Sequence, residues 1–410
     1  MTSPLMTTSA DIPDAPRAMV PPLRVALVHD WLTGMRGGEK VLEMLCERFP
    51  TAPLWTLLHV PGSVTPLIAQ RKIHTSLLQA MPHAKEKYRH YLPFFPLFAE
   101  LNKVEDADLV ISTSHAVAKS MVKRSFRNKP VHICYIHTPM RYAWDLFDEY
   151  FGPERVGWFA SKFVFKPVMQ ALQVYDRLTV GRVDLFVANS RYVAERVKRI
   201  YGREAEVLSP PVDTERFLDV LREAGDTYLV VSALVPYKRV DHAIRACAAM
   251  GRKLCIVGQG PELDNLRALA TQRGGQVDFV GFATDAELAD HYRTARALLF
   301  PGLEDFGIVP VEAIACGCPV VALGVGGILD SMTNETAVFY RESNAEALAD
   351  AIAIFEGRES EFDEAQLRAQ ARIFSRANFR LAFEATLQRM SRQAVAAKRY
   401  PITNRAPRIA

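Results

Sequence analysis

Glu304-Asp-Phe-Gly-Ile-Val-Pro-Val-Glu312 lies between two apolar runs, Ala297-Leu-Leu-Phe-Pro301 and Pro319-Val-Val-Ala-Leu323. The pattern predicts a strand, a glycine-containing loop, a helix that includes Glu312 and a second strand. Phosphorylated ligands bind at such strand ends and helix starts in α/β proteins. The two glutamates could then hydrogen-bond different parts of one extended ligand. The alternative is an exposed loop glutamate and a second glutamate that the helix dipole favours.

Composition describes a globular chain of 410 residues, with 49% hydrophobic and 23% charged residues and a net charge of +4. The length allows two or three domains, and the small net charge argues against a nucleic-acid partner. The 6 cysteines contain no Cys-x-x-Cys pair, so we expect buried free thiols in a reducing compartment. Residues 1–22 lack the apolar core of a signal peptide, and no apolar run reaches membrane-spanning length. A cytoplasmic protein is therefore expected.

Apolar strands alternate with helical stretches twice along the chain. The first set of predicted strands is Leu23–Val28, Leu109–Ser112, Val131–Ile136 and Leu185–Ala188. The second set is Tyr228–Ser232, Leu254–Val257, Val277–Val280, Ala297–Phe300 and Pro319–Leu323. Continuous apolar strands between helices predict a parallel sheet that is covered on both faces.

The predicted fold class is therefore α/β, with two doubly wound, Rossmann-like domains that face each other across a cleft. The boundaries are expected at residues 23–208 and 209–376. A last helix, over 377–400, is expected to pack back onto the first domain. Residues 1–22 are expected to form a disordered tail, and 401–410 a second tail.

The second half carries a further set of short motifs in a fixed order. They are Ser232-Ala-Leu-Val-Pro-Tyr-Lys-Arg-Val-Asp241, Val257-Gly-Gln-Gly-Pro-Glu262, Val280-Gly281, Gly317-Cys-Pro-Val-Val and Gly326-Gly327. Together with Glu304–Glu312, they make residues 205–335 closely resemble the retaining GT-B glycosyltransferases of family 4. The first half adds Gly37-Gly-Glu-Lys-Val41 and Tyr135-Ile-His-Thr-Pro-Met-Arg-Tyr-Ala-Trp-Asp145. The latter resembles the bacterial mannosyltransferases of polysaccharide and O-antigen assembly, which use GDP-mannose.

This resemblance implies a site for a sugar-nucleotide donor in the second domain. Lys238 would bind the diphosphate as a point charge. Glu312 would accept hydrogen bonds from the ribose, and Glu304 would orient the transferred sugar. Many family members have an arginine at the position of Ala233, and Arg239 is the candidate for supplying that charge.

Backbone groups complete the expected donor site. The N–H groups of Phe306, Gly307 and Ile308 would meet the sugar and the β-phosphate, where glycine permits close approach. The loop at Gly281 would pack on the base, or would be an ordinary turn at a strand end. Gly37 and Gly38 would bring N–H groups to the phosphates, with a simple tight turn as the alternative.

The remaining candidates come from the first domain. The resemblance places His137, at a strand end, near the donor sugar and the reaction centre. Arg141, Tyr142 and Trp144 follow it and would shape the sugar and acceptor sites.

No cofactor and no metal are expected at this site. Asp106-Ala-Asp108 matches the Asp-x-Asp metal motif of the other major glycosyltransferase fold, but it lies at the entry of a strand. The resemblance implies a fold that uses cationic groups and helix ends in place of a metal. Because no complete G-x-G-x-x-G motif is present, nicotinamide binding is also poorly supported.

The expected activity is retaining hexosyl transfer, first of all of α-mannosyl from GDP-mannose to a lipid-linked (polyprenyl-diphosphate) oligosaccharide in exopolysaccharide or O-antigen synthesis. The resemblance implies front-face attack, in which the departing diphosphate helps to remove the acceptor proton. A UDP-sugar or another GDP-sugar is the alternative donor. Outside the transferases, the alternatives are a sugar-nucleotide epimerase and a non-catalytic sugar-nucleotide-binding protein. The latter would retain Lys238 and Glu312 and lose Glu304 or His137.

Two segments place aromatic residues beside lysines. They are Lys85–Phe98 and Trp158–Lys166. Such a composition suits peripheral contact with an anionic membrane surface, here the cytoplasmic face of the inner membrane. Buried helices with solvated lysines are the alternative.

Overall fold

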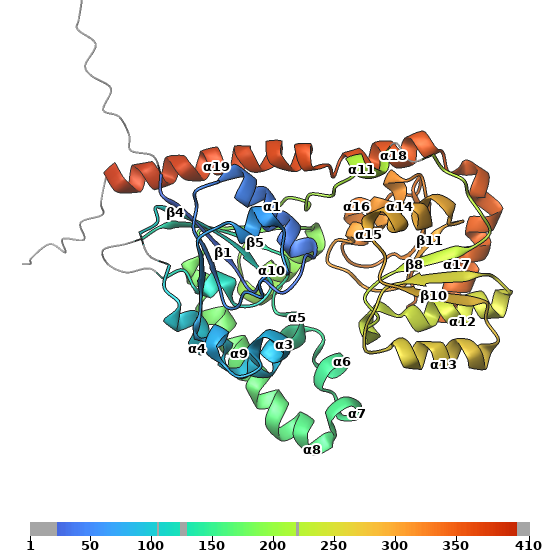
Figure 1. Cartoon of the computed structure of the whole chain (residues 1–410), viewed down its shortest axis with the longest axis horizontal. Helices are drawn as coiled ribbons and strands as arrows, with labels where there is room; N and C mark the ends of the chain where they lie inside the picture. Colours follow the sequence, from blue (N-terminus) through green and yellow to red (C-terminus); the bar gives the residue numbers. More distant parts are fainter. Residues whose placement is uncertain (1–22, 105, 124–128, 219–220, 400–410) are drawn as a thin grey trace, which may run out of the picture.

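The computed structural model describes residues 23–104, 106–123, 129–218 and 221–399, so both predicted tails, 1–22 and 401–410, lie outside the described residues. Two α/β lobes lie side by side, and the last helix runs along the first of them (Figure 1). Each lobe is built on one sheet in which all paired strands are parallel. The predicted fold of two doubly wound domains is thereby confirmed.

The first sheet has the strand order β3-β2-β1-β4-β5-β6-β7. Its strands are β1 (Val25–His29), β2 (Leu54–Thr56), β3 (Ile73–Thr75), β4 (Leu109–Ser114), β5 (Val131–Ile136), β6 (Leu185–Ala188) and β7 (Ala205–Val207). The central strands β4 and β5 are buried along their whole length, as expected for a sheet covered on both faces. The order reverses between β1 and β4, and ligands bind at this kind of switch point.

Four longer helices and several short ones surround this sheet. The longer ones are α1 (Gly37–Arg48), α4 (Phe95–Leu101), α9 (Lys166–Leu178) and α10 (Arg191–Tyr201). The shorter ones are α2 (Pro66–Ala69), η1 (Leu77–Ala80), α3 (Ala84–Lys87), η2 (Tyr88–Phe94), η3 (Ala118–Ser120), α5 (Arg141–Trp144), α6 (Phe147–Phe151), α7 (Pro153–Val156), α8 (Trp158–Ala160), η4 (Ser161–Phe165) and η5 (Val180–Arg182).

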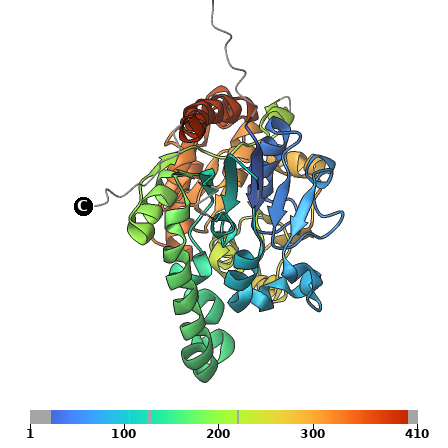
Figure 2. The same cartoon turned by 90° about the vertical axis from the view of Figure 1, so that its left-hand side faces the viewer.

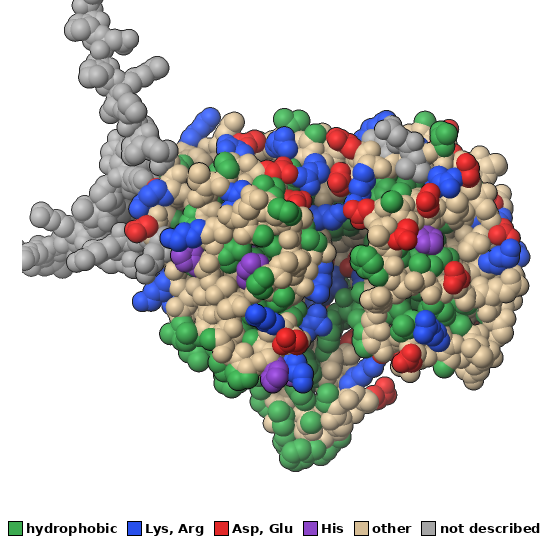
Figure 3. Space-filling view, in the orientation of Figure 1, with side chains coloured by type: hydrophobic (Ala, Val, Ile, Leu, Met, Phe, Trp, Pro, Cys, Tyr) green, Lys and Arg blue, Asp and Glu red, His purple; other side chains and the backbone are tan. Residues whose placement is uncertain are grey.

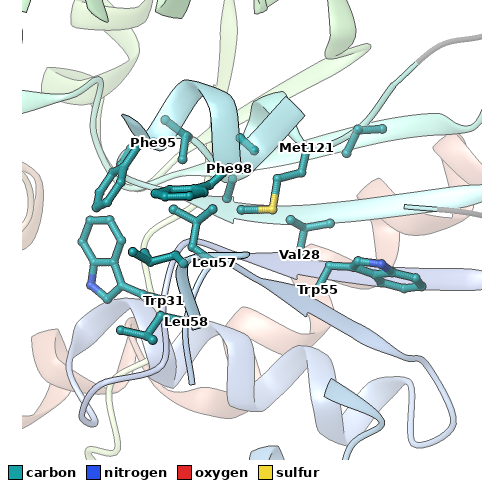
Figure 4. Close-up of a cluster of buried hydrophobic side chains, with 14 of the residues drawn as sticks. Val28, Trp31, Trp55, Leu57, Leu58, Phe95, Phe98 and Met121 are labelled. Carbon is teal, nitrogen blue, oxygen red and sulfur yellow. The ribbon is translucent and has the colours of Figure 1, made fainter. Parts of the chain in front are cut away.

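The core of the first domain fills the space between the sheet and α4. Figure 4 shows Phe95 and Phe98 of α4 facing Trp31, Leu57 and Val28 from the β1 and β2 side. The Trp31 and Phe95 ring centroids lie 5.7 Å apart. This packing fixes the loop that follows β1, which carries Trp31 toward the second domain.

The second sheet has the order β10-β9-β8-β11-β12-β13, again with a reversal, here between β8 and β11. Its strands are β8 (Tyr228–Val231), β9 (Leu254–Val257), β10 (Val277–Gly281), β11 (Leu298–Phe300), β12 (Val320–Leu323) and β13 (Ala337–Tyr340). Its helices are α11 (Glu215–Leu218), η6 (Pro236–Lys238), α12 (Val240–Met250), α13 (Leu263–Arg273), α14 (Asp285–Thr294), α15 (Ile308–Ala315), α16 (Ile328–Ser331), α17 (Ala345–Arg358), η7 (Glu359–Glu361) and α18 (Glu364–Arg372).

The chain crosses between the lobes twice, and the two crossings lie side by side. Val212 on the outward path pairs with Ser375 on the return path in a parallel bridge. Helix α19 (Arg376–Arg399) then runs along the first domain. Its buried residues Phe379, Phe383 and Leu387 join a second core cluster of that domain, separate from the one beside α4.

Residues 147–178, here called the arm, project away from both sheets. Figures 1 and 2 show α6, α7 and α8 at the far end and α9 leading back to the domain. Buried Lys119 and Asp176 anchor its base, with 2.7 Å between Lys119 Nζ and Asp176 Oδ1. Among the described residues, none of the helices has both the length and the apolar character needed to cross a bilayer.

Candidate functional site

A cavity of about 450 Å³ lies between the two domains. It opens where both sheets have their switch points, since Trp31 and His115 follow β1 and β4, and Ser232 and Glu304 follow β8 and β11. The hollow between the two lobes is visible in Figure 3. Of the predicted site residues, those that line the cavity are Gly37, Gly38, His137, Arg141, Lys238, Glu304, Phe306, Gly307 and Ile308.

Glu304 is held between two cations in this cavity. Lys238 contacts one carboxylate oxygen, and Arg141 Nη2 of the first domain lies 3.4 Å from the other. Burial and the neighbouring Arg141 lower the pKa of Lys238 to about 7, and Asp305 acts in the opposite direction. An incoming diphosphate would therefore share Lys238 with Glu304.

Asp305, next to Glu304, binds two arginines of the first domain. Arg141 Nε donates to it over 2.8 Å, and Arg196 Nη1 over 3.1 Å. Arg196 also binds Thr138 and Asp145. Asp305 and Arg196 are both buried, so this interdomain ion-pair cluster is shielded from solvent. Neither residue was among the site residues predicted from the sequence.

The start of α15 faces the first domain through backbone groups. Gly307 has φ 91°, and no side chain caps this helix start. Its first N–H groups are thus available to an anion, which the helix dipole also favours. Gly37 lies directly opposite, where a Cβ atom would come 2.8 Å from Ile308 Cδ1. Glycine at this position permits the close approach of the two domains.

His137 presents an imidazole to the same space. Asn189 Nδ2 donates to its backbone carbonyl over 3.0 Å, and a Cβ atom on Gly38 would lie 3.4 Å from its Nε2. This Nε2 is buried and has no hydrogen-bond partner among the described residues. Burial, together with His115 and His29, lowers the pKa of His137 to about 3. The ring is therefore neutral at physiological pH and can donate or accept one hydrogen bond to a ligand.

His115 is a cavity residue that the sequence analysis missed, and buried Asp30 positions it. The carboxylate accepts four backbone N–H bonds, from His115 (2.6 Å), Ala116 (2.9 Å), Val117 (2.7 Å) and Ala118 (2.6 Å). His115 Nδ1 lies 3.3 Å from the same carboxylate. A charged residue directly after the first buried strand was the signal available in the sequence.

Glu312 and Gly281 do not line the cavity. Glu312 lies a turn into α15, where its carboxylate accepts hydrogen bonds from Arg216 Nη2 and the Tyr292 hydroxyl, each over 3.2 Å. Burial raises its pKa. Gly281 ends β10 with φ 82°. Arg216 and Tyr292 were not singled out in the sequence.

Three further candidates lie elsewhere. Arg239 binds Glu149 of the arm over 2.9 Å and lines a separate cavity, so its side chain is not placed to supply the charge absent at Ala233. Trp144 Nε1 donates to Asp176 over 2.8 Å at the base of the arm. The Tyr142 hydroxyl is buried and has no hydrogen-bond partner among the described residues.

The Asp106-Ala-Asp108 segment is organised around an arginine. Arg24 Nη2 lies 3.2 Å from Asp108, and Arg24 Nη1 lies 3.6 Å from Asp106. In the part of the chain that the structure describes, no three His, Cys, Asp or Glu residues are grouped so that they could hold a metal ion.

Two family models match successive parts of the chain. Residues 35–216 match "Glycosyltransferase Family 4", and residues 212–372 match "Glycosyl transferases group 1". The boundary between the matches coincides with the first crossing between the lobes.

Curated relatives match parts of this chain. A GDP-mannose-dependent alpha-(1-6)-phosphatidylinositol monomannoside mannosyltransferase of Mycobacterium tuberculosis is 32% identical over 212 residues, 45% of this chain and 55% of its own. A D-inositol 3-phosphate glycosyltransferase of Mycobacterium sp. (strain KMS) is 31% identical over 177 residues, 38% of this chain and 40% of its own. The matches thus span about half of these relatives or less.

Solved structures match over more of the length. The Anabaena protein Alr3699/HepE in complex with UDP superposes with a TM-score of 0.65 at 16% identity, over 89% of this chain and 100% of its own. The two parallel-sheet domains are those of the GT-B fold, as the sequence predicted.

Proposed function

Because this chain has the GT-B fold of the group 1 and family 4 glycosyltransferases, we propose that it moves a hexose from a sugar nucleotide to an acceptor bound between its domains. The observation that carries this proposal is the cavity at the two switch points. There Lys238, Glu304 and the start of α15 face His137 and Arg141 of the other domain.

The proposed donor is GDP-mannose. The resemblance of Tyr135–Asp145 to bacterial mannosyltransferases supports it, as does the GDP-mannose dependence named for the mycobacterial relative. In this arrangement the diphosphate lies against Lys238 and the N–H groups at the start of α15. Glu312, with Arg216 and Tyr292 bound to it, would take the ribose hydroxyls at the far end of the nucleotide.

The proposed chemistry is transfer with retention of configuration. The bond from the anomeric carbon to the departing diphosphate breaks as the acceptor hydroxyl attacks the same face, and the diphosphate takes the acceptor proton. Lys238 and the helix start would stabilise the charge that develops on the leaving group. Neutral His137 and Glu304 would position the sugar through hydrogen bonds. No metal is assigned a role in this scheme.

The proposed acceptor is a lipid-linked oligosaccharide in exopolysaccharide or O-antigen synthesis. It would enter beside Arg36, Trp31 and His115, which line the first-domain side of the cavity. These side chains offer a cation, an aromatic face and an imidazole, which are groups that bind sugars and phosphates.

A panel of donors tests the assignment. Purified protein is incubated with GDP-mannose, GDP-glucose, UDP-glucose or UDP-galactose and a membrane lipid extract, and glycolipid products are analysed by mass spectrometry and NMR. Turnover of GDP-mannose to an α-linked product is expected, with loss of turnover in Lys238→Met. Turnover of a UDP-sugar alone would overturn the donor, and a β-linked product would overturn retention.

A further inference from the structure

The tip of the arm exposes four apolar side chains. Trp158, Phe159, Phe163 and Val164 are 60%, 69%, 54% and 50% exposed. The rings of Trp158 and Phe159 contact that of Phe163, with centroids 5.7 and 5.1 Å apart, and their remaining surface faces solvent. These four residues are called the tip below. Figure 3 shows a cluster of hydrophobic atoms at this lowest point of the molecule.

The apolar surface continues from the tip along α9. Val164, Pro167, Ala171, Val174 and Leu178 are all exposed. They follow one another at spacings of three and four residues, so they form one stripe on the outer side of the helix. Val174 and Leu178 are 58% and 77% exposed. A helix whose inner side packs on the domain would normally carry polar residues on this outer side.

The charged residues between the tip and the stripe of α9 are lysines. No Asp or Glu occurs between Arg155 and Tyr175, whereas Lys162 and Lys166 do. Lys162 Nζ lies 4.9 Å from the centroid of the Trp158 ring, so its ammonium group makes a cation–π contact with the tip. Aromatic rings beside lysines are typical of the interface between lipid headgroups and acyl chains.

We propose that the tip inserts into the interface of an anionic lipid bilayer and that the apolar stripe of α9 rests on its surface. A second copy of this chain is less suited to this surface, because lysine is depleted at protein–protein interfaces. The projection of the arm beyond both domains lets the tip reach the bilayer first (Figure 2). Vesicle binding needs neither donor nor acceptor, so this inference stands apart from the proposed sugar transfer.

The four tryptophans provide a local probe. Trp31 and Trp55 are buried, Trp144 is partly buried, and Trp158 alone is exposed. Vesicles of brominated phosphatidylcholine with about one-third phosphatidylglycerol should quench wild-type emission, whereas Trp158→Phe should keep binding and lose the quenching. Emission that the brominated lipid leaves unchanged would overturn insertion of the tip.

Co-sedimentation with the same vesicles, unbrominated, tests both parts of the surface. Phe159→Ser combined with Phe163→Ser should weaken binding about tenfold or more, given the apolar area withdrawn. Lys162→Glu combined with Lys166→Glu should abolish the preference over pure phosphatidylcholine vesicles. Leu381→Ser, at a residue of α19 that is 72% exposed, is the matched control and should bind as wild type does. Equal binding by all variants would overturn the proposal, as would a dimer in solution that only the tip variants dissociate.

Discussion

Glu304 pairs with Lys238 and Arg141 in this structure. A substitution can remove its charge while keeping its size and shape. Glu304→Gln keeps the shape and releases Lys238 and Arg141. We expect transfer to fall about a hundredfold or more, as when a positioned polar group is lost from an active site. Affinity for the nucleoside diphosphate should stay unchanged or rise, because Lys238 loses a competing carboxylate. Steady-state rates and calorimetric titration with GDP measure the two effects.

Glu262→Gln is the matched control for this substitution. Glu262 also pairs with an arginine of the other domain, Arg155, over 3.2 Å, but it lies outside the cleft cavity. It should leave the transfer rate within about twofold, as expected for a partly exposed pair. Full activity of Glu304→Gln would show that Glu304 has no part in the reaction.

His137 should make the protein less stable in acid. Its pKa is lowered from 6.5 to about 3 by burial, so the unfolded chain binds one more proton than the folded one between these values. The stabilisation from neutral His137 is thus complete above pH 6.5 and is lost progressively as the pH falls toward 3. His137→Gln removes this linkage, and its midpoint of thermal unfolding should approach or pass that of the wild type between pH 7 and 4.5. A constant difference in midpoint over this range would contradict the buried neutral state.

At the scale of elements, the buried ion pair beneath the arm should dominate its stability. Asp176 binds Lys119 and accepts hydrogen bonds from Trp144 and Tyr201, each over 2.8 Å. Asp176→Asn leaves a buried lysine without its counter-charge, and we expect a loss of about 3–5 kcal/mol in unfolding free energy. Urea denaturation measures this.

The matched control is the exposed pair Lys198–Glu204, whose side chains are 67% and 80% exposed. Glu204→Gln should cost less than about 1 kcal/mol. Similar losses for both substitutions would mean that the network at Asp176 is not what anchors α9.

Strand prediction succeeded where apolar runs were long enough to be buried on both faces. The predicted spans Val131–Ile136, Leu185–Ala188 and Leu254–Val257 coincide with β5, β6 and β9. Strands β2, β3, β7 and β13 were missed, and each has only three or four residues. The equally short β11 was found because it lies within the apolar run Ala297–Pro301. β3 and β7 are edge strands with partly exposed residues, so they lack the continuous apolar pattern that identifies a central strand.

The two aromatic segments show that local composition does not determine whether aromatic side chains are buried. Residues 85–98 and 158–166 both combine aromatic residues with lysines, but only the first segment packs against the sheet. Phe95 and Phe98 point into the core, whereas Trp158 and Phe159 point to solvent. Composition could not decide between these outcomes because burial depends on which elements meet in the folded domain.

The same reasoning applies to the candidate site. Motif order found Lys238, Glu304 and His137, which the structure brings into one cavity. Arg196 could not be found in this way, because its partner Asp305 lies 109 positions away and in the other domain. Sequence also could not show that Arg239, with a left-handed backbone (φ 52°), binds Glu149 of the arm.

At the scale of the whole molecule, Asp305 should hold the two domains together. It is shared by Arg141 and Arg196 of the first domain in a shielded setting. Asp305→Asn leaves two arginines with a weakened partner, so the open form should gain population. Small-angle scattering without ligand should give a larger radius of gyration than wild type, and a saturating donor should reduce the difference.

Asp330→Asn provides the comparison within the same interface. Asp330 also binds an arginine of the other domain, Arg191, but that side chain is 72% exposed. Exposed pairs contribute only about 0–1 kcal/mol, so this variant should keep the wild-type radius. If both variants had the same increase in radius of gyration, closure would depend on the overall charge of the interface and not on Asp305 in particular.

The paired crossings of the chain decide which rim of the cleft can widen. Val212 and Ser375 are bridged, and Val212 N–H donates to the Phe374 carbonyl over 2.9 Å, so two bonded chain segments form a pivot at one end. The arm lies at the end of the molecule opposite the pivot (Figure 1). Rotation about the pivot therefore separates Arg155 from Glu262 and Arg239 from Glu149 before it disturbs the pivot itself. The two domains would therefore separate as a hinge, with the widest opening beside the arm.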